Sequence, residues 1–198
     1  HAATVRLAQT LGLTKHTPMD TRVHCREKAF FAFGTARLFE RRLRRVNNLR
    51  NWITYLGIVV PMLIGGVAMS FDTKALPYVI IPAGLIGLIQ LALSAWSLVA
   101  KWDDRHAFSL NALQAHTKLF NEWDALAKNN PPDIVAKAAV LDVVDREQEA
   151  KDMTQMVTKQ EKNYGMRSAL FQFGNECATC RVRPTSLKPS GCDTCGNF

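Results

Sequence analysis

Two long apolar stretches without a charged residue dominate the pattern of hydrophobic and polar positions. The first covers residues 51–71, the second covers 75–100, and only residues 72–74 separate them. A helix rises about 1.5 Å per residue, so each stretch is long enough to cross a hydrocarbon core of about 30 Å. The pattern therefore predicts a transmembrane helical hairpin over 51–100. The alternative, a soluble hairpin, would require two successive helices that are apolar on all sides to be covered by the rest of a short chain.

Polar segments with a helical spacing of apolar residues flank this hairpin. Residues 20–50 are predicted to form a basic amphipathic helix that leads into the first stretch. After the second stretch, 101–173 is predicted to form a cytoplasmic helical hairpin, with a break where Asn129 and Asn130 precede two prolines. Asp133 is a candidate N-cap for the second of these helices, which we expect to continue to about residue 173.

Basic residues lie on both sides of the predicted transmembrane hairpin, whereas the turn within it carries one lysine. They are Arg37, Arg41, Arg42, Arg44, Arg45 and Arg50 before it, and Lys101 and Arg105 after it. Cytoplasmic flanks are enriched in Lys and Arg, so this bias predicts two spans with both termini in the cytoplasm. An anionic membrane surface also accounts for the net charge of +8, which makes nucleic-acid binding the less favoured explanation.

The uncharged interior of the predicted spans limits the function classes. Transporters and proton relays need ionisable groups at membrane depth, and Gln90 is the strongest polar group within the two stretches. One hairpin cannot enclose water, so a pore would need several copies. The chain also contains no Gly-rich phosphate loop and no recognisable nucleophile–base pair. The sequence therefore predicts no catalytic residues and gives no case for an enzyme.

Several polar residues outside the hairpin could be taken for ligands, but their spacing does not support it. Asp103, Asp104, His106 and His116 match no metal-binding motif and are expected to lie on a solvated helix face. Cys25 has no second ligand pair nearby and is expected to be an ordinary thiol.

The first 19 residues fall outside these patterns. Residues 1–19 lack an apolar core of the length that a signal peptide needs, and Met19 is the first methionine of the chain. We expect this segment to be disordered or to be upstream sequence, which N-terminal mass spectrometry of the native protein would decide.

Four of the five cysteines form two C-x-x-C pairs near the C-terminus. Cys177 and Cys180 make the first pair, Cys192 and Cys195 make the second, and 11 residues separate them. Each C-x-x-C turn can direct two thiolates at one ion, and two turns complete a tetrahedral site. Disulfides are the alternative, but the predicted cytoplasmic location keeps thiols reduced. The spacing therefore predicts a zinc knuckle over 174–198, with a structural Zn ion bound by the four cysteines.

Four segments carry a resemblance to a known family. They are Ala32–Ala36, Leu56–Pro61, Trp96–Asp104 and Cys192–Phe198. Together with the hairpin and the cysteine spacing, these segments resemble the SLATT-domain two-transmembrane proteins, and more narrowly the mobile-element group named for CxxC-x11-CxxC. The resemblance covers the chain from about residue 20 to its end. It implies a membrane effector of a bacterial antiviral or mobile-element conflict system, which oligomerises on a trigger and permeabilises the inner membrane.

The sequence-based expectation is therefore an all-α membrane protein of the bacterial inner membrane. The partners implied are the lipid bilayer, further copies of the chain, and a nucleotide second messenger or a neighbouring defence protein as trigger. The alternative is a membrane-anchored adaptor whose cytoplasmic helices and zinc knuckle recruit a protein or nucleic-acid partner. Replacing both spans by an unrelated hairpin separates the two hypotheses, because only the adaptor would keep its function.

Overall fold

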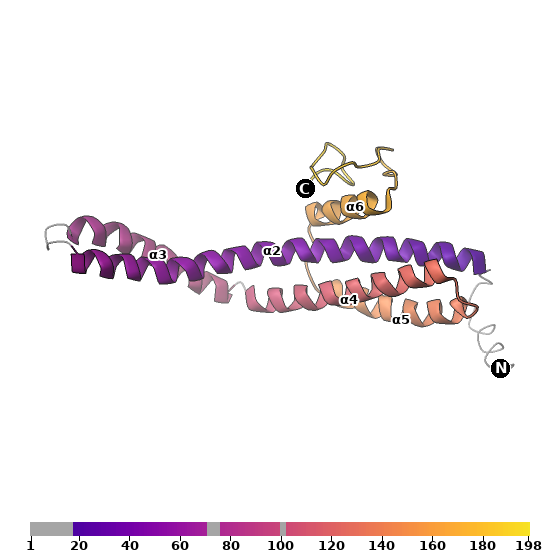
Figure 1. Cartoon of the computed structure of the whole chain (residues 1–198), viewed down its shortest axis with the longest axis horizontal. Helices are drawn as coiled ribbons and strands as arrows, with labels where there is room; N and C mark the ends of the chain where they lie inside the picture. Colours follow the sequence, from indigo (N-terminus) through magenta and orange to yellow (C-terminus); the bar gives the residue numbers. More distant parts are fainter. Residues whose placement is uncertain (1–17, 71–75, 100–101) are drawn as a thin grey trace. The chain divides into compact units, whose positions relative to one another are not determined.

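The computed structural model describes residues 18–70, 76–99 and 102–198. Within these ranges the chain is helical and contains no strand (Figure 1). The helices are α2 (Pro18–Ser70), α3 (Leu76–Val99), α4 (Trp102–Asn129), α5 (Ile134–Asp152) and α6 (Lys159–Phe173). The helical character that the sequence predicts is thus observed. The expectations for residues 1–17 lie outside the described residues.

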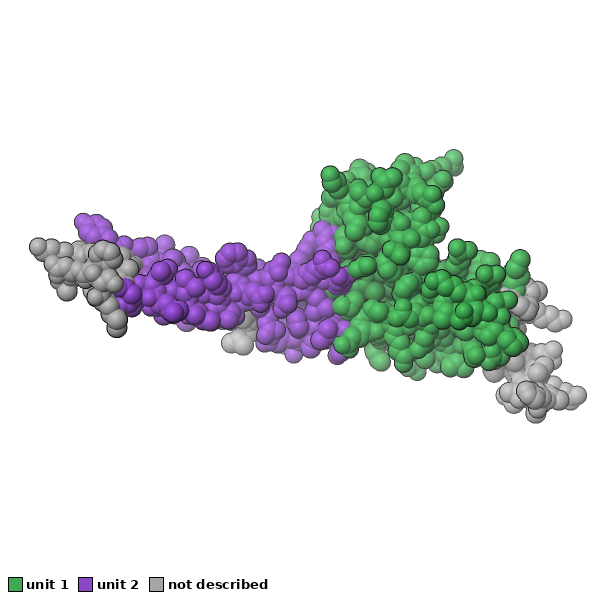
Figure 2. All heavy atoms as spheres, in the orientation of Figure 1, with its two compact units in different colours: residues 1–39, 112–198 green, residues 40–111 purple. Residues whose placement is uncertain are grey.

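The chain divides into two compact units (Figure 2). Unit 1 contains residues up to Phe39 together with 112–198, and unit 2 contains 40–111. Helices α2 and α4 each contribute residues to both units. The cysteine pairs belong to unit 1, whereas the two apolar stretches belong to unit 2.

The membrane part of the predicted fold is wrong. Among the helices of the described residues, none combines the length and the apolar character that crossing a membrane requires. The predictions of a two-span transmembrane hairpin and of an inner-membrane location are corrected by this finding. They rested on the absence of charge over 51–71 and 75–100, yet Phe71, Ala75 and Ala100 of those stretches lie outside the described helices. Within the helices, Pro61, Pro82 and several glycines and polar residues interrupt the apolar sequence.

In unit 2, residues 51–70 of α2 and the whole of α3 form what we call the apolar hairpin. Gly57 of α2 lies against Gln90 of α3, since a Cβ added to this glycine would come 2.7 Å from the Gln90 amide nitrogen. Arg50 of α2 pairs with Asp103 of α4 at 3.2 Å. Most of the large apolar side chains of this hairpin are exposed.

Unit 1 is built around a core between α2, α4 and α5. Its buried residues recur at intervals of three or four along each helix, which places them on one face. They are Cys25, Ala29, Ala32, Leu119, Trp123, Ala127, Ile134, Ala138 and Leu141. The alanines allow the helices to approach closely around the large ring of Trp123, which is fully buried.

Helix α6 packs on α2 at a pair of glycines. A Cβ on Gly165 would lie 2.6 Å from the carbonyl oxygen of Gly34, and a Cβ on Gly34 would lie 3.0 Å from the carbonyl oxygen of Gly165. Real Cβ atoms essentially never approach as closely as 2.6 Å, and 3.0 Å is tighter than most real contacts, so the close approach of the two backbones depends on both residues being glycine. This crossing fixes α6, and with it the cysteine-rich tail, on unit 1.

The helix expected from Asp133 to Phe173 is two helices in the structure. Helix α5 ends at Asp152, and α6 begins after Thr158 with a capping box. The Thr158 hydroxyl accepts from the Glu161 backbone N–H at 3.2 Å, and the Thr158 N–H donates to the Glu161 carboxylate at 2.9 Å. These bonds satisfy two backbone groups at the new N-terminus and end the preceding turn.

Candidate metal centre

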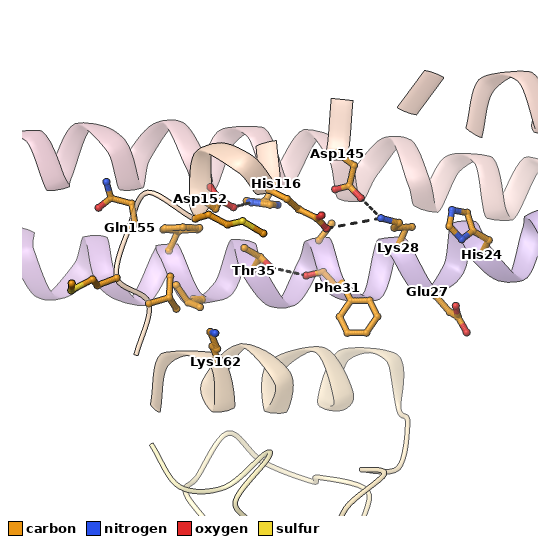
Figure 3. A pocket seen from close by; sticks show the side chains of 17 residues that line it. His24, Glu27, Lys28, Phe31, Thr35, His116, Asp145, Asp152, Gln155 and Lys162 are labelled. Carbon is orange, nitrogen blue, oxygen red and sulfur yellow. Dashed lines mark hydrogen bonds and ion pairs between the residues drawn. The ribbon is translucent and has the colours of Figure 1, made fainter. Parts of the chain in front are cut away.

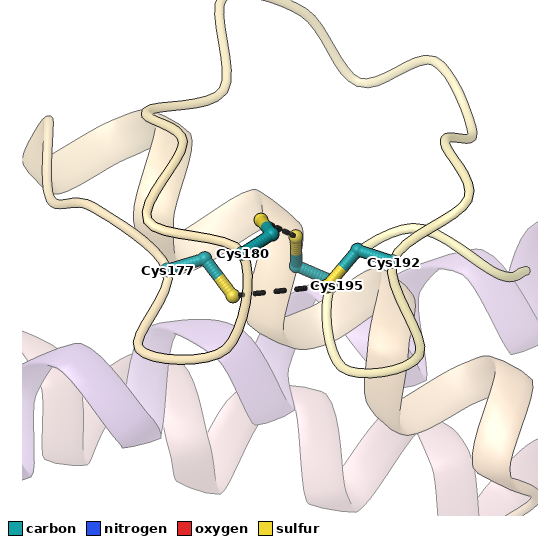
Figure 4. A group of neighbouring side chains, drawn as sticks. All are labelled: Cys177, Cys180, Cys192 and Cys195. Carbon is teal, nitrogen blue, oxygen red and sulfur yellow. Dashed lines mark hydrogen bonds between the residues drawn. The ribbon is translucent and has the colours of Figure 1, made fainter.

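The structure brings the four predicted cysteines together (Figure 4). All four Sγ atoms lie within 4.8 Å of one another. Across the two pairs, Cys177 Sγ is 4.0 Å from Cys192 Sγ, and Cys180 Sγ is 3.9 Å from Cys195 Sγ. Metal–sulfur bonds of about 2.3 Å in a tetrahedral site place sulfurs about 3.8 Å apart. A disulfide would need about 2 Å. The arrangement therefore fits a single ion bound by four thiolates.

The two C-x-x-C turns have matching backbone geometry. The Arg181 N–H donates to the Cys177 carbonyl at 2.7 Å, and the Gly196 N–H donates to the Cys192 carbonyl at 2.9 Å. The residues that precede the second cysteine of each turn, Thr179 and Thr194, share a hydrogen bond between their hydroxyls at 2.7 Å. The turns thus face each other as near-equivalent halves, and each half contributes two sulfurs to the cluster.

Backbone N–H groups favour the thiolate form of the first cysteine of each turn, Cys177 and Cys192. The N–H groups of Thr194 and Cys195 lower the pKa of Cys192 to about 7, because they stabilise its thiolate. Burial opposes ionisation of Cys177, but the N–H groups of Cys180 and Thr179 outweigh it and lower its pKa. Burial raises the pKa of Cys195. The cluster therefore combines thiols that ionise readily with one whose ionisation needs a cation.

Helix α6 holds the second turn through a buried amide. Asn163 Nδ2 donates to the carbonyls of Asp193 and Asn197, at 2.8 Å and 3.0 Å. The ring of the next residue, Tyr164, meets the ring of Phe198 edge-on, with 5.3 Å between the ring centroids. These contacts join the last residues of the chain to α6, so movement of the cysteine turn would break two hydrogen bonds of the buried Asn163 amide.

A buried arginine supplies positive charge beside the cluster. Arg167 Nε donates to the Ser186 carbonyl at 2.9 Å, and its Nη1 donates to the Cys195 carbonyl at 3.3 Å and to the Ser190 hydroxyl at 3.2 Å. Four thiolates around a divalent ion leave two negative charges, and a buried guanidinium offsets part of them. Sequence reasoning missed Arg167 and Asn163. The signal that could have revealed them is their spacing of four in the helix that immediately precedes the first C-x-x-C.

The other polar residues considered from sequence do not join this centre. Asp103 and Asp104 are exposed, as expected of a solvated helix face. His116 is buried instead, and its Nε2 pairs with the carboxylate of Asp152 at 2.5 Å. Cys25 lies in the core of unit 1, where burial raises its pKa to about 11. It is a free, buried thiol.

A comparison with protein families gives one match. The family described as "Mobilome CxxCx(11)CxxC protein" matches residues 22–198. This match includes both units and all four cysteines, and it confirms the mobile-element part of the resemblance found in the sequence. The SLATT-domain part stays a prediction. Neither the curated proteins nor the solved structures gave a significant match.

Proposed function

Because the chain belongs to the mobilome CxxCx(11)CxxC protein family, we propose that it is an oligomeric adaptor of a mobile element. In this proposal the apolar hairpin joins copies of the chain, and unit 1 presents a surface to a partner. The observation that carries it is the exposure of the large apolar side chains of the hairpin. The membrane-permeabilising role is not part of the proposal, because it requires transmembrane spans and no helix of the described residues is long and apolar enough to form one.

The exposed apolar surface of the hairpin is too extensive for a chain that works alone. Met62 of α2 is 71% exposed, and Ile81 and Leu91 of α3 are 74% and 73% exposed. The larger set is Trp52, Tyr55, Ile58, Met62, Leu63, Tyr78, Ile80, Ile81, Leu85, Leu88, Ile89, Leu91 and Trp96. Monomeric soluble proteins seldom expose apolar patches beyond a few hundred Å². A partner surface of similar character is therefore expected to cover these side chains.

Further copies of the same chain are the partner that this surface favours. Helix α3 has no charged residue, so it offers no charge pattern by which a different protein could be selected. Copies related by symmetry bring the same patch to both sides of the interface. Gly65, Gly66 and Gly84 have open space where a Cβ would be, which lets a second helix approach closely.

Burial of the hairpin provides enough free energy for association. Removing one Leu or Ile side chain from water contributes about 1.5–3 kcal/mol. Loss of translational and rotational freedom on association costs about 4–15 kcal/mol. Burial of several of the exposed apolar side chains is enough to offset this cost. Replacing one exposed apolar residue of the hairpin by a smaller one should therefore weaken the assembly. Replacing two of them by charged residues should abolish it.

We take the ion at the cysteine cluster to be zinc with a structural role. Four thiolates in a tetrahedral arrangement suit Zn²⁺, and a fully protein-bound site leaves no position for a substrate or water. Since binding and folding are coupled in such small sites, zinc would keep the tail folded against α6 and so shape the partner-binding surface of unit 1.

Light scattering of the full chain, measured during size-exclusion chromatography, tests the oligomer. We expect wild type to elute as an assembly of several copies, and the double variant Ile81→Glu/Leu88→Glu to elute as a monomer. Val143→Glu is the matched control, because Val143 is also exposed but belongs to unit 1. A monomeric wild type, or an assembly that the double variant leaves intact, would contradict the proposal.

A further inference from the structure

A groove of about 1060 Å³ lies in unit 1, away from the cysteine cluster (Figure 3). It is lined by α2, by the end of α5 and by the segment Met153–Val157 that leads to α6. We propose that this groove binds a peptide segment of a partner protein, with an apolar side chain flanked by Lys or Arg. The inference rests on the adaptor function proposed above and names the chemistry of its partner.

The charge of the groove favours a cationic occupant. The lining residues include four carboxylates, Glu27, Asp145, Glu149 and Asp152, but only two lysines. An acidic cleft with low-dielectric walls attracts cations and repels phosphates. A basic segment is therefore favoured over a nucleotide or a nucleic acid.

Lys28 does not neutralise this charge. Its ammonium lies 2.7 Å from Asp145, 3.8 Å from Asp142 and 4.0 Å from Glu149, so three carboxylates surround one cation. Burial disfavours the charged form of Lys28, but the hydrogen bond and charge of Asp145 outweigh it and raise its pKa. The lysine stays protonated. Asp142 lies outside the groove lining and also contacts His24 at 3.2 Å, whereas Asp145 and Glu149, which line the groove, leave one negative charge unbalanced beside Lys28.

Apolar side chains stand exposed along the same groove. Phe31 of α2 is 57% exposed, and Met153 and Met156 are 84% and 95% exposed. Methionine is unbranched and polarisable, so it adapts to apolar partners of different shape. The combination of these three side chains with the carboxylates matches a segment that is both apolar and basic.

The methionine-bearing segment is held in place without an occupant. Asp152, at the end of α5, binds His116 Nε2 at 2.5 Å and accepts from Gln148 at 2.9 Å. The ring of Phe39 stacks on His116 at 6.0 Å between centroids. The capping box of Thr158 fixes the other end of the segment. A preformed wall lowers the entropic cost of binding, because little has to be ordered when the peptide arrives.

The test uses fluorescence polarisation with a labelled helical peptide of Leu and Lys, and with its counterpart of Leu and Glu. The full zinc-loaded chain is titrated against each, both as wild type and in the Ile81→Glu/Leu88→Glu background. We expect the Lys peptide to bind in both backgrounds and the Glu peptide to bind at least about tenfold more weakly. The double variant is expected not to self-associate. Loss of peptide binding in this background would therefore count against the groove alone, and it would not bear on whether the wild-type chain forms an oligomer.

Matched variants locate the binding. Glu149→Lys and Met156→Ser should each weaken the Lys peptide by about tenfold or more. Glu147→Lys, an exposed residue of the same helix outside the groove lining, and Met19→Ser, 75% exposed in α2, should change it by less than about twofold. Circular dichroism and zinc content confirm that each variant is folded.

Three results would overturn the inference. If Glu149→Lys and Glu147→Lys reduce the affinity for the Lys peptide equally, the peptide is attracted by the overall charge of α5 and does not bind in the groove. Tighter binding of the Glu peptide or of a single-stranded oligonucleotide would assign the surface to another class of ligand. Displacement of the Lys peptide by added Ile81→Glu/Leu88→Glu chain would make a second copy the occupant instead.

Discussion

Replacement of Gly165 by alanine should weaken the attachment of α6 to α2. The new Cβ would lie 2.6 Å from the carbonyl oxygen of Gly34, 3.2 Å from its carbonyl carbon and 3.6 Å from the Cβ of Leu38. The nearest of these atoms is backbone, which cannot rotate away as a side chain can. The two helices must therefore separate, and the buried contacts on both sides of the crossing are lost in part.

The expected magnitude follows from two opposing effects. An extra methyl group forced into a packed interface costs about 1–3 kcal/mol. Alanine has a higher helix propensity than glycine, which returns about 1 kcal/mol in the folded helix. Because the Cβ would lie 2.6 Å from a backbone oxygen, the upper part of that range, about 2–3 kcal/mol, applies to Gly165→Ala. The expected net loss in its free energy of unfolding is therefore about 1–2 kcal/mol. Gly34→Ala should lose less, because its Cβ would lie at 3.0 Å from the opposing carbonyl.

Urea denaturation followed by circular dichroism measures this change, and hydrogen exchange of the α6 amides locates it. Gly87→Ala is the control, since a Cβ there meets nothing within 4 Å and the residue is inside α3 of unit 2. It should leave α6 unchanged and make the hairpin as stable as before or slightly more so. The reasoning is refuted if Gly165→Ala unfolds at the same urea concentration as wild type, or if α6 amides exchange no faster.

Two further predictions concern the cysteine cluster. Cys177→Ser should abolish stoichiometric zinc binding, because three thiolates cannot close the site; metal analysis of the purified chain measures this. The same variant should expose residues 174–198 to protease. A variant that keeps both its zinc and its resistance to protease would contradict this prediction. While the second turn stays folded, the N–H groups of Thr194 and Cys195 lower the pKa of Cys192 from 9.0 to about 7, so the stability that its thiolate contributes is complete above pH 9 and is lost as the pH falls through 7. An alkylating reagent should therefore modify Cys192 near neutral pH, as mapped by mass spectrometry. Cys25, whose pKa is raised to about 11 by burial, should react only after unfolding. Reaction of Cys25 before Cys192 would refute this order of reactivity.

The sequence predicted the cluster of four cysteines because the geometry of each pair is local. Cys177 and Cys180 lie in one turn, Cys192 and Cys195 lie in another, and the spacing within each turn already fixes how two sulfurs point. Only the meeting of the two turns had to be assumed, and the structure shows it. The break before α6 also had a local signal, the capping box from Thr158 to Glu161, which the apolar spacing alone did not reveal.

What the sequence did not predict depends on residues far apart in the chain. His116 and Asp152 are 36 residues apart, so a histidine expected on a solvated face proved to be buried and paired. Gly34 and Gly165 permit a helix crossing that neither position indicates by itself. The membrane prediction failed for a different reason. The prediction rested on the length and the lack of charge of 51–71 and 75–100, whereas no helix of the described residues is long and apolar enough to cross a membrane.

Native mass spectrometry of the full chain, purified without chelator, tests the central claim most directly, because one spectrum gives both the number of copies and the number of ions. The account predicts assemblies of two or more chains with one zinc per chain, and zinc-loaded monomers for Ile81→Glu/Leu88→Glu. A wild-type chain that is monomeric over the accessible concentration range, or an assembly that persists unchanged in the double variant, would contradict the claim that the exposed hairpin joins copies of this protein.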